Sequence, residues 1–450
     1  MDDYRLIADQ VAAEIADGRL RPGRQLPTQR AFARSRGIAN STAGRVYREL
    51  ARRGLTVGEV GRGTFVRAGR APDGARVALA EPAAALVDLE LNYPSVPGQA
   101  ELLASGLAPL LRPDALGDAL RPAAAAGTGA ARRAFAGLVS VDSWEVGAGE
   151  LLFAGNGRQA IAGALSALVP TGQRLGVEEL TYPVVKAVAE RLGIVPVPLA
   201  MDEHGLLPDA VAAAHRAAPL RAVYVQPRLQ NPLGTSLPGD RAAELVAVLR
   251  RLDLPVVEDA IWSFLRPDSA PLAALAPERT ALVDSLSKRL APGLTTGFAV
   301  VPAALHERVA GALRSGGWTP SGFALEAAVR WIGDGTLAAV EAAKRADATA
   351  RQLLAREVLA GQRLRSDPCS YYLWWELPAG RRAEAFVAEA ERAGISVTPA
   401  AAFAVDPRRS PSAVRVGLAS PPLPVLARAL GTLAGIAQGV GDDGPRTDDS

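Results

Sequence analysis

The ten residues from 284 to 293 read Asp-Ser-Leu-Ser-Lys-Arg-Leu-Ala-Pro-Gly and contain Lys288, one of three lysines beside 47 arginines in the chain. A guanidinium stays protonated and cannot condense with an aldehyde, whereas a lysine amine with a lowered pKa can form a Schiff base. In this chain a lysine therefore marks a position where arginine cannot serve. The alternative is that the bias reflects genome composition and that Lys288 is a chance survivor.

Length and composition indicate a globular protein of two or three domains, because the chain has 450 residues, 49% of them hydrophobic and 22% charged. The N-terminus lacks the basic and then apolar residues of a secretion signal, and no apolar run approaches the roughly 20 residues of a membrane span. A single cysteine, Cys369, excludes an intramolecular disulfide. With only three histidines, the chain offers few ligands for zinc. We expect a cytoplasmic protein without a metal or a membrane segment.

Charge divides the chain into two parts. Residues 1–67 hold thirteen arginines against seven acidic residues, whereas the remainder holds 37 basic and 40 acidic residues. A basic head on a mildly acidic body indicates that the head binds a polyanion. A generic solvated surface is the alternative.

The head, residues 1–67, has the pattern of a winged helix-turn-helix. Capping residues, glycine stops and helical spacing predict three helices and a hairpin, namely helices over 4–16, from the N-cap Thr28 to 36, and from the capping pair Asn40-Ser41 to 53, with strands over 55–59 and 64–67. The short turn around 37–40 gives helix-turn-helix spacing, which leaves the third helix able to enter a major groove.

Three residues at the start of that third helix, Ser41, Thr42 and Arg45, are expected to face the DNA. Amides at a helix N-terminus bind phosphate, and a guanidinium can read guanine through two hydrogen bonds. The hairpin tip, Gly61-Arg62-Gly63-Thr64, is the expected wing, where small residues let the backbone approach the duplex while Arg62 reaches into a groove.

The head resembles the GntR family of bacterial regulators. The resemblance rests on an ordered series of segments at 15–23, 26–30, 46–50 and 61–66, together with Thr42. It implies that operator DNA is contacted by Arg30, Arg34, Thr42, Arg45 and the wing residues. The alternative is a helix-turn-helix used only for binding protein.

After a linker at 68–86, the body over 87–437 alternates short apolar runs with longer Ala- and Leu-rich helices. The clearest runs are Arg174–Val177, Ala222–Val225, Pro255–Glu258 and Ala281–Asp284. Such alternation predicts an α/β fold with a mostly parallel sheet covered by helices. The polar, acidic stretch at 438–450 is expected to be a disordered tail.

Polar residues of defined kinds follow these runs. Gly157, Arg158 and Gln159 open a helix after a strand, where their amides and the guanidinium could hold a phosphate. Asp259 ends a buried run, and ligands of open α/β sheets bind at that end. The remaining candidates are Tyr182 for ring stacking, Asn231 as a hydrogen-bond donor, and Ser285 and Ser287 as further phosphate ligands.

Together with Lys288 this set meets the needs of pyridoxal phosphate: an amine, a carboxylate near the pyridine nitrogen, a donor to the phenolic oxygen, a phosphate cup and a flat partner for the ring. Each piece alone has an ordinary alternative. A glycine turn before a helix is common, Tyr182 could simply be packed, and Asn231 could serve only its turn.

In this order and spacing, the body resembles the fold-type I aminotransferases, with a large sheet domain and a smaller C-terminal α+β domain. With a GntR-type head in front, the chain resembles the MocR subfamily of regulators. The resemblance implies a homodimer that binds operator DNA, pyridoxal phosphate and an amino-acid or amine effector.

Three positions stand out against the family pattern. Thr295 replaces the arginine that usually binds the cofactor phosphate, and Arg158 or Arg289 is the hypothetical substitute. Trp262 replaces a tyrosine that donates to the phenolate in many relatives, and an indole has only an N–H to offer. Arg415 retains the arginine that clamps a substrate carboxylate in aminotransferases, with a surface salt bridge as its alternative.

Three functions are compatible with these residues. The favoured one is a DNA-binding regulator that senses pyridoxal phosphate or an amino compound through a Schiff base on Lys288. The second is an active aminotransferase with a DNA-binding head, in which Lys288 also shuttles a proton. The third is a regulator with a vestigial body that binds no cofactor.

Overall fold

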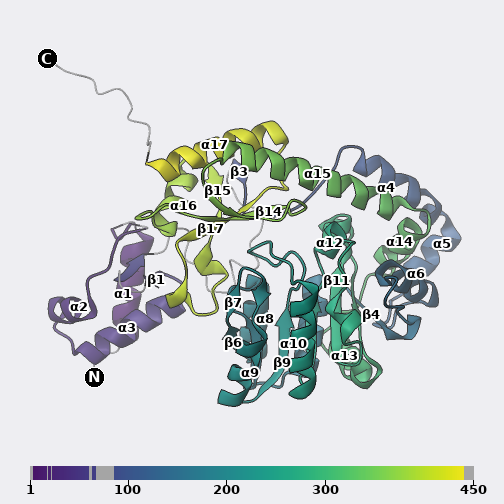
Figure 1. Cartoon of the computed structure of the whole chain (residues 1–450), viewed down its shortest axis with the longest axis horizontal. Coiled ribbons are helices and arrows are strands. Elements are labelled where there is room, and N and C mark those ends of the chain that lie inside the picture. The colour runs from purple at the N-terminus through teal and green to yellow at the C-terminus, as the bar shows by residue number, and fades with distance from the viewer. Residues whose placement is uncertain (1–3, 18, 22, 60–62, 67–85, 440–450) are drawn as a thin grey trace. The chain divides into compact units, whose positions relative to one another are not determined.

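The computed structural model describes residues 4–17, 19–21, 23–59, 63–66 and 86–439 (Figure 1). The chain divides into two compact units, one formed by residues up to Asn92 with 353–365 and 372 onward, and the other by 93–352 and 366–371. The predicted linker over 68–86, apart from Leu86, and the predicted tail beyond Gly439 lie outside the described residues. Among the described helices, none combines the length and apolar character needed to cross a membrane.

The head folds as a winged helix-turn-helix. Its elements are α1 (Tyr4–Ala16), α2 (Gln29–Arg36), α3 (Asn40–Arg52), β1 (Thr56–Glu59) and β2 (Gly63–Val66), the two strands pairing antiparallel. The predicted cap of α2 is confirmed, because the Thr28 hydroxyl accepts the Ala31 amide at 3.3 Å. Gly37 then ends α2 in a left-handed conformation with φ of 65°. The predicted Asn40-Ser41 cap is wrong, since both residues lie inside the first turn of α3 and Ala39 precedes it in extended geometry.

A small apolar core holds the three helices together. Val11, Val46 and Leu50 are buried between α1 and α3. Phe32 and Tyr47 meet edge to face with ring centroids 5.2 Å apart, and the Tyr47 hydroxyl donates to the Pro27 carbonyl at 2.6 Å. The apolar spacing of α3 thus turns its opposite face, which carries Arg45 and Arg48, toward solvent.

The larger unit is built on a seven-stranded sheet in the order β4-β12-β11-β10-β9-β5-β6. Its strands are β4 (Leu151–Ala154), β5 (Arg174–Glu178), β6 (Val195–Leu199), β9 (Leu220–Val225), β10 (Val256–Asp259), β11 (Thr280–Ser285) and β12 (Gly297–Val300). Only β12 runs antiparallel to its neighbours, which confirms the expected mostly parallel sheet. A hairpin of β7 (Met201–Asp202) and β8 (Gly205–Leu206) lies outside it.

Helices alternate with these strands. They are α4 (Gln99–Leu107), α5 (Pro113–Ala119), α6 (Gly129–Val139), α7 (Gly157–Leu168), α8 (Pro183–Leu192), α9 (Pro208–Ala217), α10 (Gly239–Arg251), α11 (Leu272–Leu275), α12 (Leu286–Arg289), α13 (Ala303–Ser315), α14 (Gly322–Gly333) and α15 (Thr336–Val358). One core cluster packs α6 and α14 with β4 and β12, and another packs α9 and α10 with β9 and β10.

The C-terminal residues form the expected α+β domain. An antiparallel sheet has the order β13-β14-β17-β16, formed by β13 (Arg363–Arg365), β14 (Tyr372–Glu376), β16 (Thr398–Pro399) and β17 (Ala413–Gly417). β3 (Val87–Asp88) pairs with β15 (Ile395–Ser396). Trp375 and Val414 bury the sheet against α16 (Ala383–Arg392) and α17 (Leu423–Gln438).

Candidate functional site

One edge of the large sheet collects the predicted cofactor residues. Strands β5, β9, β10 and β11 run parallel, and β4 runs the same way because both β4 and β11 are antiparallel to β12. The carboxyl ends of these strands therefore meet at one edge. The segments that follow them are 155–159, 179–182, 226–231, 260–262 and 286–289. Every predicted contact from Gly157 to Arg289 lies in one of these segments, except Asp259 and Ser285, which are the last residues of β10 and β11 at the same edge.

Asp259 ends β10 and is 1% exposed. The Tyr224 hydroxyl donates to one of its carboxyl oxygens at 2.6 Å, and the Ile261 amide donates to the other at 3.0 Å. Burial raises the pKa of Asp259 to about 6, and the bond from Tyr224 opposes this rise. A protonated pyridine nitrogen beside Asp259 would offset the burial, so this carboxyl group suits a cationic partner. Sequence reasoning missed Tyr224, although a tyrosine in an otherwise apolar strand was the available signal.

Asn231 lies in a buried polar network. Its backbone amide donates to Gln226 Oε1 at 3.1 Å, and Gln230 Nε2 donates to Glu178 Oε2 at 3.2 Å. Burial raises the pKa of Glu178 to about 8. The network fixes the loop that carries Asn231. Glu178, Gln226 and Gln230 were not predicted, although all three are polar residues at or just after the ends of buried strands.

Lys288 lies in the one-turn helix α12, with its amine between two aromatic rings. The Lys288 Nζ atom is 4.8 Å from the ring centroid of Tyr93 and 5.4 Å from that of Trp262. Trp262 is itself stacked on Phe264, with centroids 6.4 Å apart and planes at 27°. Trp262 therefore gives the amine a flat apolar neighbour. Tyr93 was missed by sequence reasoning, because nothing local links it to a residue almost 200 positions later.

The N-terminus of α7 lies against Ser285. A Cβ atom at Gly157 would be 3.1 Å from Ser285 Oγ, and Ser285 Oγ is 2.7 Å from Ser287 Oγ. Asn156 caps the helix by accepting the Gln159 amide at 3.0 Å, so that amide is already engaged. Amides at Gly157 and Arg158 with the two serine hydroxyls form a cradle of the kind that binds phosphate.

Two more hydroxyls precede β12 at the same sheet edge. The Oγ1 atoms of Thr295 and Thr296 are buried and have no hydrogen-bond partner among the described residues. The Leu286 amide donates to the Thr296 carbonyl at 3.0 Å, which ties this segment to α12. Buried hydroxyls without partners are costly, and an oxygen-rich ligand would satisfy them. These hydroxyls, the cradle and Asp259 fit the phosphate and the pyridine nitrogen of pyridoxal phosphate.

The two candidate substitutes for the missing phosphate arginine differ. The guanidinium of Arg289 is buried and donates to Asp284 at 2.7 Å, and also to Glu341 and Ser263. This geometry argues against Arg289 as a phosphate ligand, since its donors are engaged by two carboxylates. Arg158, at the start of α7, forms no ion pair with any described residue. Arg158 is therefore the better candidate.

Arg415 lies in β17 of the smaller unit and is buried, at 9% exposed. It donates to the Glu90 carbonyl and to the Thr398 hydroxyl, the latter at 3.2 Å, and its guanidinium carbon is 5.1 Å from the Phe403 ring centroid. Burial raises the pKa of Glu90 to about 7, opposed by Arg415. The alternative of a surface salt bridge is therefore wrong for Arg415.

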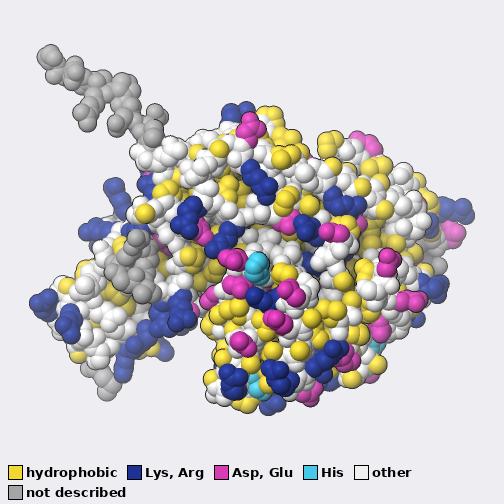
Figure 2. Space-filling view, viewed as in Figure 1, with side chains coloured by type: hydrophobic (Ala, Val, Ile, Leu, Met, Phe, Trp, Pro, Cys, Tyr) yellow, Lys and Arg dark blue, Asp and Glu magenta, His cyan; other side chains and the backbone are white. Residues whose placement is uncertain are grey.

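The head carries the predicted nucleic-acid interface. Arg30, Arg34, Ser41 and Arg45 are exposed, and Thr42 is half-buried. Figure 2 shows basic side chains gathered on the head with few acidic ones among them. Gly63 begins β2, whereas Arg62 lies outside the described residues.

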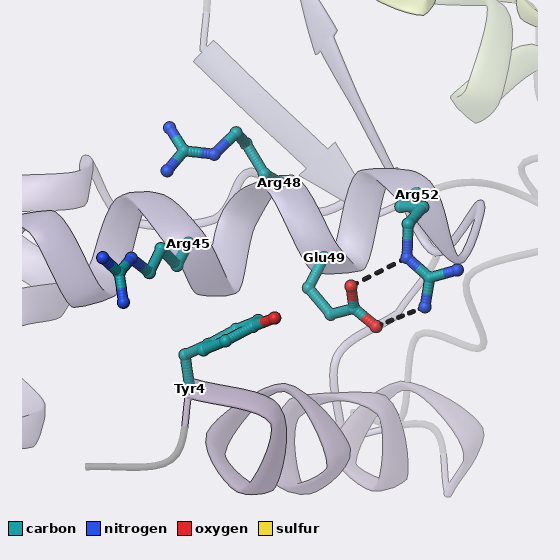
Figure 3. Close-up of a pocket in the computed structure, with 5 residues that line it drawn as sticks. All are labelled: Tyr4, Arg45, Arg48, Glu49 and Arg52. Carbon is teal, nitrogen blue, oxygen red and sulfur yellow. Dashed lines mark hydrogen bonds and ion pairs between the residues drawn. The ribbon is translucent and has the colours of Figure 1, made fainter. Parts of the chain in front are cut away.

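A pocket of about 330 Å³ opens between α1 and α3, lined by Tyr4, Arg45, Arg48, Glu49 and Arg52 (Figure 3). Glu49 accepts from Arg52 at 2.6 Å and from Arg53 at 2.8 Å, which lowers its pKa to about 2. Arg45 and Arg48 form no ion pair with the residues that the structure describes. Glu49, the one carboxylate among the described residues that line the pocket, is thus neutralised, which leaves the described outer face of α3 basic.

Comparison with known proteins gives matches to both parts of the chain. A model of the aminotransferase class I and II family matches residues 125–433, and one of the bacterial regulatory proteins of the gntR family matches residues 3–66. The uncharacterized HTH-type transcriptional regulator YdeF of Bacillus subtilis is 27% identical over 93% of this chain and 90% of its own length. The HTH-type pyridoxine biosynthesis transcriptional regulator PdxR of Corynebacterium glutamicum is 36% identical over 29% of this chain and 28% of its own.

Solved structures show the fold of the body. An archaeal alanine:glyoxylate aminotransferase superposes with a TM-score of 0.73 at 19% identity, covering 81% of this chain and 93% of its own. A multiple substrate aminotransferase from Thermococcus profundus superposes with a TM-score of 0.72 at 18% identity, covering 82% of this chain and 96% of its own. The chain therefore belongs to the aminotransferase class I and II family and carries a gntR-family domain at its N-terminal end, the combination found in MocR-type regulators.

Proposed function

We propose that the protein is a transcriptional regulator whose body binds pyridoxal phosphate at Lys288 and reports that cofactor, or an amino compound that reacts with it, to operator DNA. The observation that carries the proposal is the convergence of an aromatic-flanked lysine, a buried carboxyl group and a hydroxyl-lined cradle at one sheet edge. The basic face of α3 supplies the DNA-binding surface. A relative that matches over 93% of this chain is named as a transcriptional regulator, which supports the proposal. We expect the protein to act as a homodimer in the cytoplasm.

Each residue has a defined task in this proposal. Pyridoxal phosphate, when bound, supplies an aldehyde that condenses with a lysine amine. Lys288 provides that amine, and Asp259, oriented by Tyr224, holds a proton on the pyridine nitrogen. Gly157, Arg158, Ser285 and Ser287 bind the phosphate.

Other groups place the ring and the effector. Tyr182 or Trp262 lies along the ring face, and Asn231 donates to the phenolic oxygen. Arg415 is the proposed ligand of an effector carboxylate. An effector changes DNA binding only if it favours one of two conformations of the protein, so its affinity for the two must differ.

Borohydride reduction followed by peptide mapping tests the proposal. Wild type incubated with pyridoxal phosphate should show a visible absorbance band, and reduction should fix the label on Lys288 alone. The chain has only two other lysines, Lys186 and Lys344, so the map is unambiguous. Lys288→Ala should lose both signals. A wild type without band or label would favour a vestigial body instead.

Amino-acid turnover is a second candidate, because Lys288, Asp259 and Arg415 stand at the positions that the resemblance to aminotransferases assigns to the cofactor and to a substrate carboxylate. It predicts that a candidate amino acid yields the matching keto acid in a single turnover. Sensing alone predicts a change in absorbance without keto acid. The two functions are therefore separated by one mass-spectrometric measurement.

A further inference from the structure

A second lysine lies directly behind Lys288. Lys344, on α15, is fully buried at 0% exposed. Its Nζ atom donates to the Lys288 carbonyl at 2.9 Å and also to the Leu290 carbonyl. The side chain of Lys344 thus contacts the main chain of Lys288, 56 positions earlier in the chain. The third lysine, Lys186, lies on α8.

The contact replaces hydrogen bonds that a longer helix would supply. α12 has four residues, and its backbone leaves helical geometry at Leu290 with φ of −113° and ψ of −95°. The last carbonyls of a helix have no partner within it. Lys344 satisfies two of them, and Gln99 Nε2 also donates to Leu290 at 3.2 Å.

α15 also holds the side chain between these two carbonyls. Glu341, one turn before Lys344, accepts from Arg289, which also donates to Asp284 at 2.7 Å and to Ser263 at 3.3 Å. Three successive residues, 288 to 290, are therefore held by one face of α15, two through the main chain and one through its guanidinium. A backbone tied in this way fixes the point and the direction from which the Lys288 side chain leaves α12.

Burying an amine costs free energy, because its charged form loses the hydration it has in water. Burial lowers the pKa of Lys344 to about 7, whereas Glu341 and Asp347 favour its charged form. Both carboxylates are themselves paired, with Arg289 and with Arg351 at 2.7 Å. A methionine has a similar volume and no such cost. The lysine therefore has a task that depends on its donors.

We propose that Lys344 is a positioning residue for Lys288, whose amine it keeps between Tyr93 and Trp262 by fixing the Lys288 and Leu290 carbonyls. The inference rests on the proposed function, since it assigns to Lys344 the support of the cofactor-binding lysine. Lys344 itself forms no bond to the cofactor, because its Nζ atom faces the carbonyls behind α12.

Lys344→Met is the decisive variant, with Lys186→Met as the matched control. Without cofactor, amide hydrogen exchange of the full-length protein should rise in the peptide over 286–296 of Lys344→Met only. The affinity of Lys344→Met for pyridoxal phosphate should be about tenfold or more below that of wild type, which is the scale of losing a charge-assisted hydrogen bond. The pH midpoint of the visible band should shift as well, because Lys288 is displaced from its aromatic neighbours. Borohydride mapping of wild type should leave Lys344 unlabelled.

Lys344→Gln, which keeps a shorter donor, covers the case in which Lys344→Met does not fold, and its effects should be intermediate. The inference would be overturned if a folded Lys344 variant had the cofactor affinity, the pH midpoint of the visible band and the amide exchange over 286–296 of wild type. The proposed function would then still stand. A wild type without label on Lys288 would instead refute the proposed function. The exchange measurement without cofactor would still decide whether Lys344 holds α12.

Discussion

The outer face of α3 and the carboxyl edge of the large sheet are the two surfaces proposed to bind anions, and they differ in exposure. On α3, Arg45 is exposed and the one carboxylate of the pocket beside it, Glu49, is neutralised by its own arginines. At the sheet edge, the candidate phosphate donors Ser285 and Thr296 are fully buried. A polyanion as large as DNA needs charge at the surface, whereas a small phosphate ester needs a few enclosed donors.

The comparison shows where the charge of a surface can be inferred from residue types alone. In the head, formal charge describes the binding surface, because exposed arginines keep their charge. At the sheet edge, burial raises the pKa of Asp259 to about 6 and that of Glu178 to about 8, so hydrogen-bond partners decide which groups are ionised. The following variants separate the two surfaces.

Asp259→Asn should give the largest effect. It keeps the shape of the side chain but removes the charge expected beside the pyridine nitrogen, so affinity for pyridoxal phosphate should fall about 10- to 100-fold. Absorbance titration measures this fall. Asp209→Asn, at an exposed position on α9, is the control. If Asp259→Asn and Asp209→Asn bound pyridoxal phosphate with equal affinity, Asp259 would not be a cofactor ligand.

Arg45→Ala should affect only the other surface. Affinity for operator DNA should fall about tenfold, and the slope of log affinity against log salt should shrink by about 1 if the contact is to phosphate. Fluorescence anisotropy at several salt concentrations measures both. Arg19→Ala removes a head arginine that already pairs with Asp17 and should change neither. Weakened cofactor binding in Arg45→Ala would contradict the separation.

Arg158→Ala tests the phosphate cradle. Its affinity for pyridoxal phosphate should fall roughly fivefold, less than for Asp259→Asn, because Arg158 is partly exposed and water weakens its charge. Adding Thr295→Arg, which restores the arginine of the family pattern, should recover the loss. A double variant no better than Arg158→Ala would show that position 295 does not face the phosphate.

Glu49→Gln should give the smallest effect, confined to the head. The folded pKa of Glu49 is lowered to about 2 by Arg52 and Arg53, so its stabilising effect is present above pH 4.5 and lost as pH falls toward 2. Amide exchange over α3 in the full-length protein should be slightly faster in Glu49→Gln than in wild type at pH 6. The difference should vanish near pH 2, and its persistence there would contradict the assignment.

Sequence reasoning served the head better than the sheet edge, for a physical reason. Thr28 and Gly37 act within four residues of the helix they bound, so α2 could be predicted from its own sequence. The Ala39 start of α3 could not, since no side chain caps that helix. At the sheet edge, the alternation of strands and helices predicted a mostly parallel sheet. Asp259 is the last residue of one of its strands, and Asn231 and Lys288 follow two others.

Contacts between distant residues escaped prediction. Tyr224 and Asp259 are 35 positions apart, and Lys344 and Lys288 are 56 apart. From the sequence, Arg289 was a candidate phosphate ligand, but in the structure its guanidinium donates to Glu341, 52 positions later in the chain. Partners of this kind depend on which strands pair, as for Tyr224 and Asp259, and on how helices pack on the sheet, as for Lys344 and Lys288. Local propensity specifies neither.

DNA affinity with and without pyridoxal phosphate, measured on wild type and Lys288→Ala, tests most directly whether the two surfaces are coupled. We predict that the cofactor changes the affinity or the footprint of wild type on its operator and leaves Lys288→Ala unchanged. Identical binding by both proteins, with and without cofactor, would contradict coupling between the sheet edge and the head.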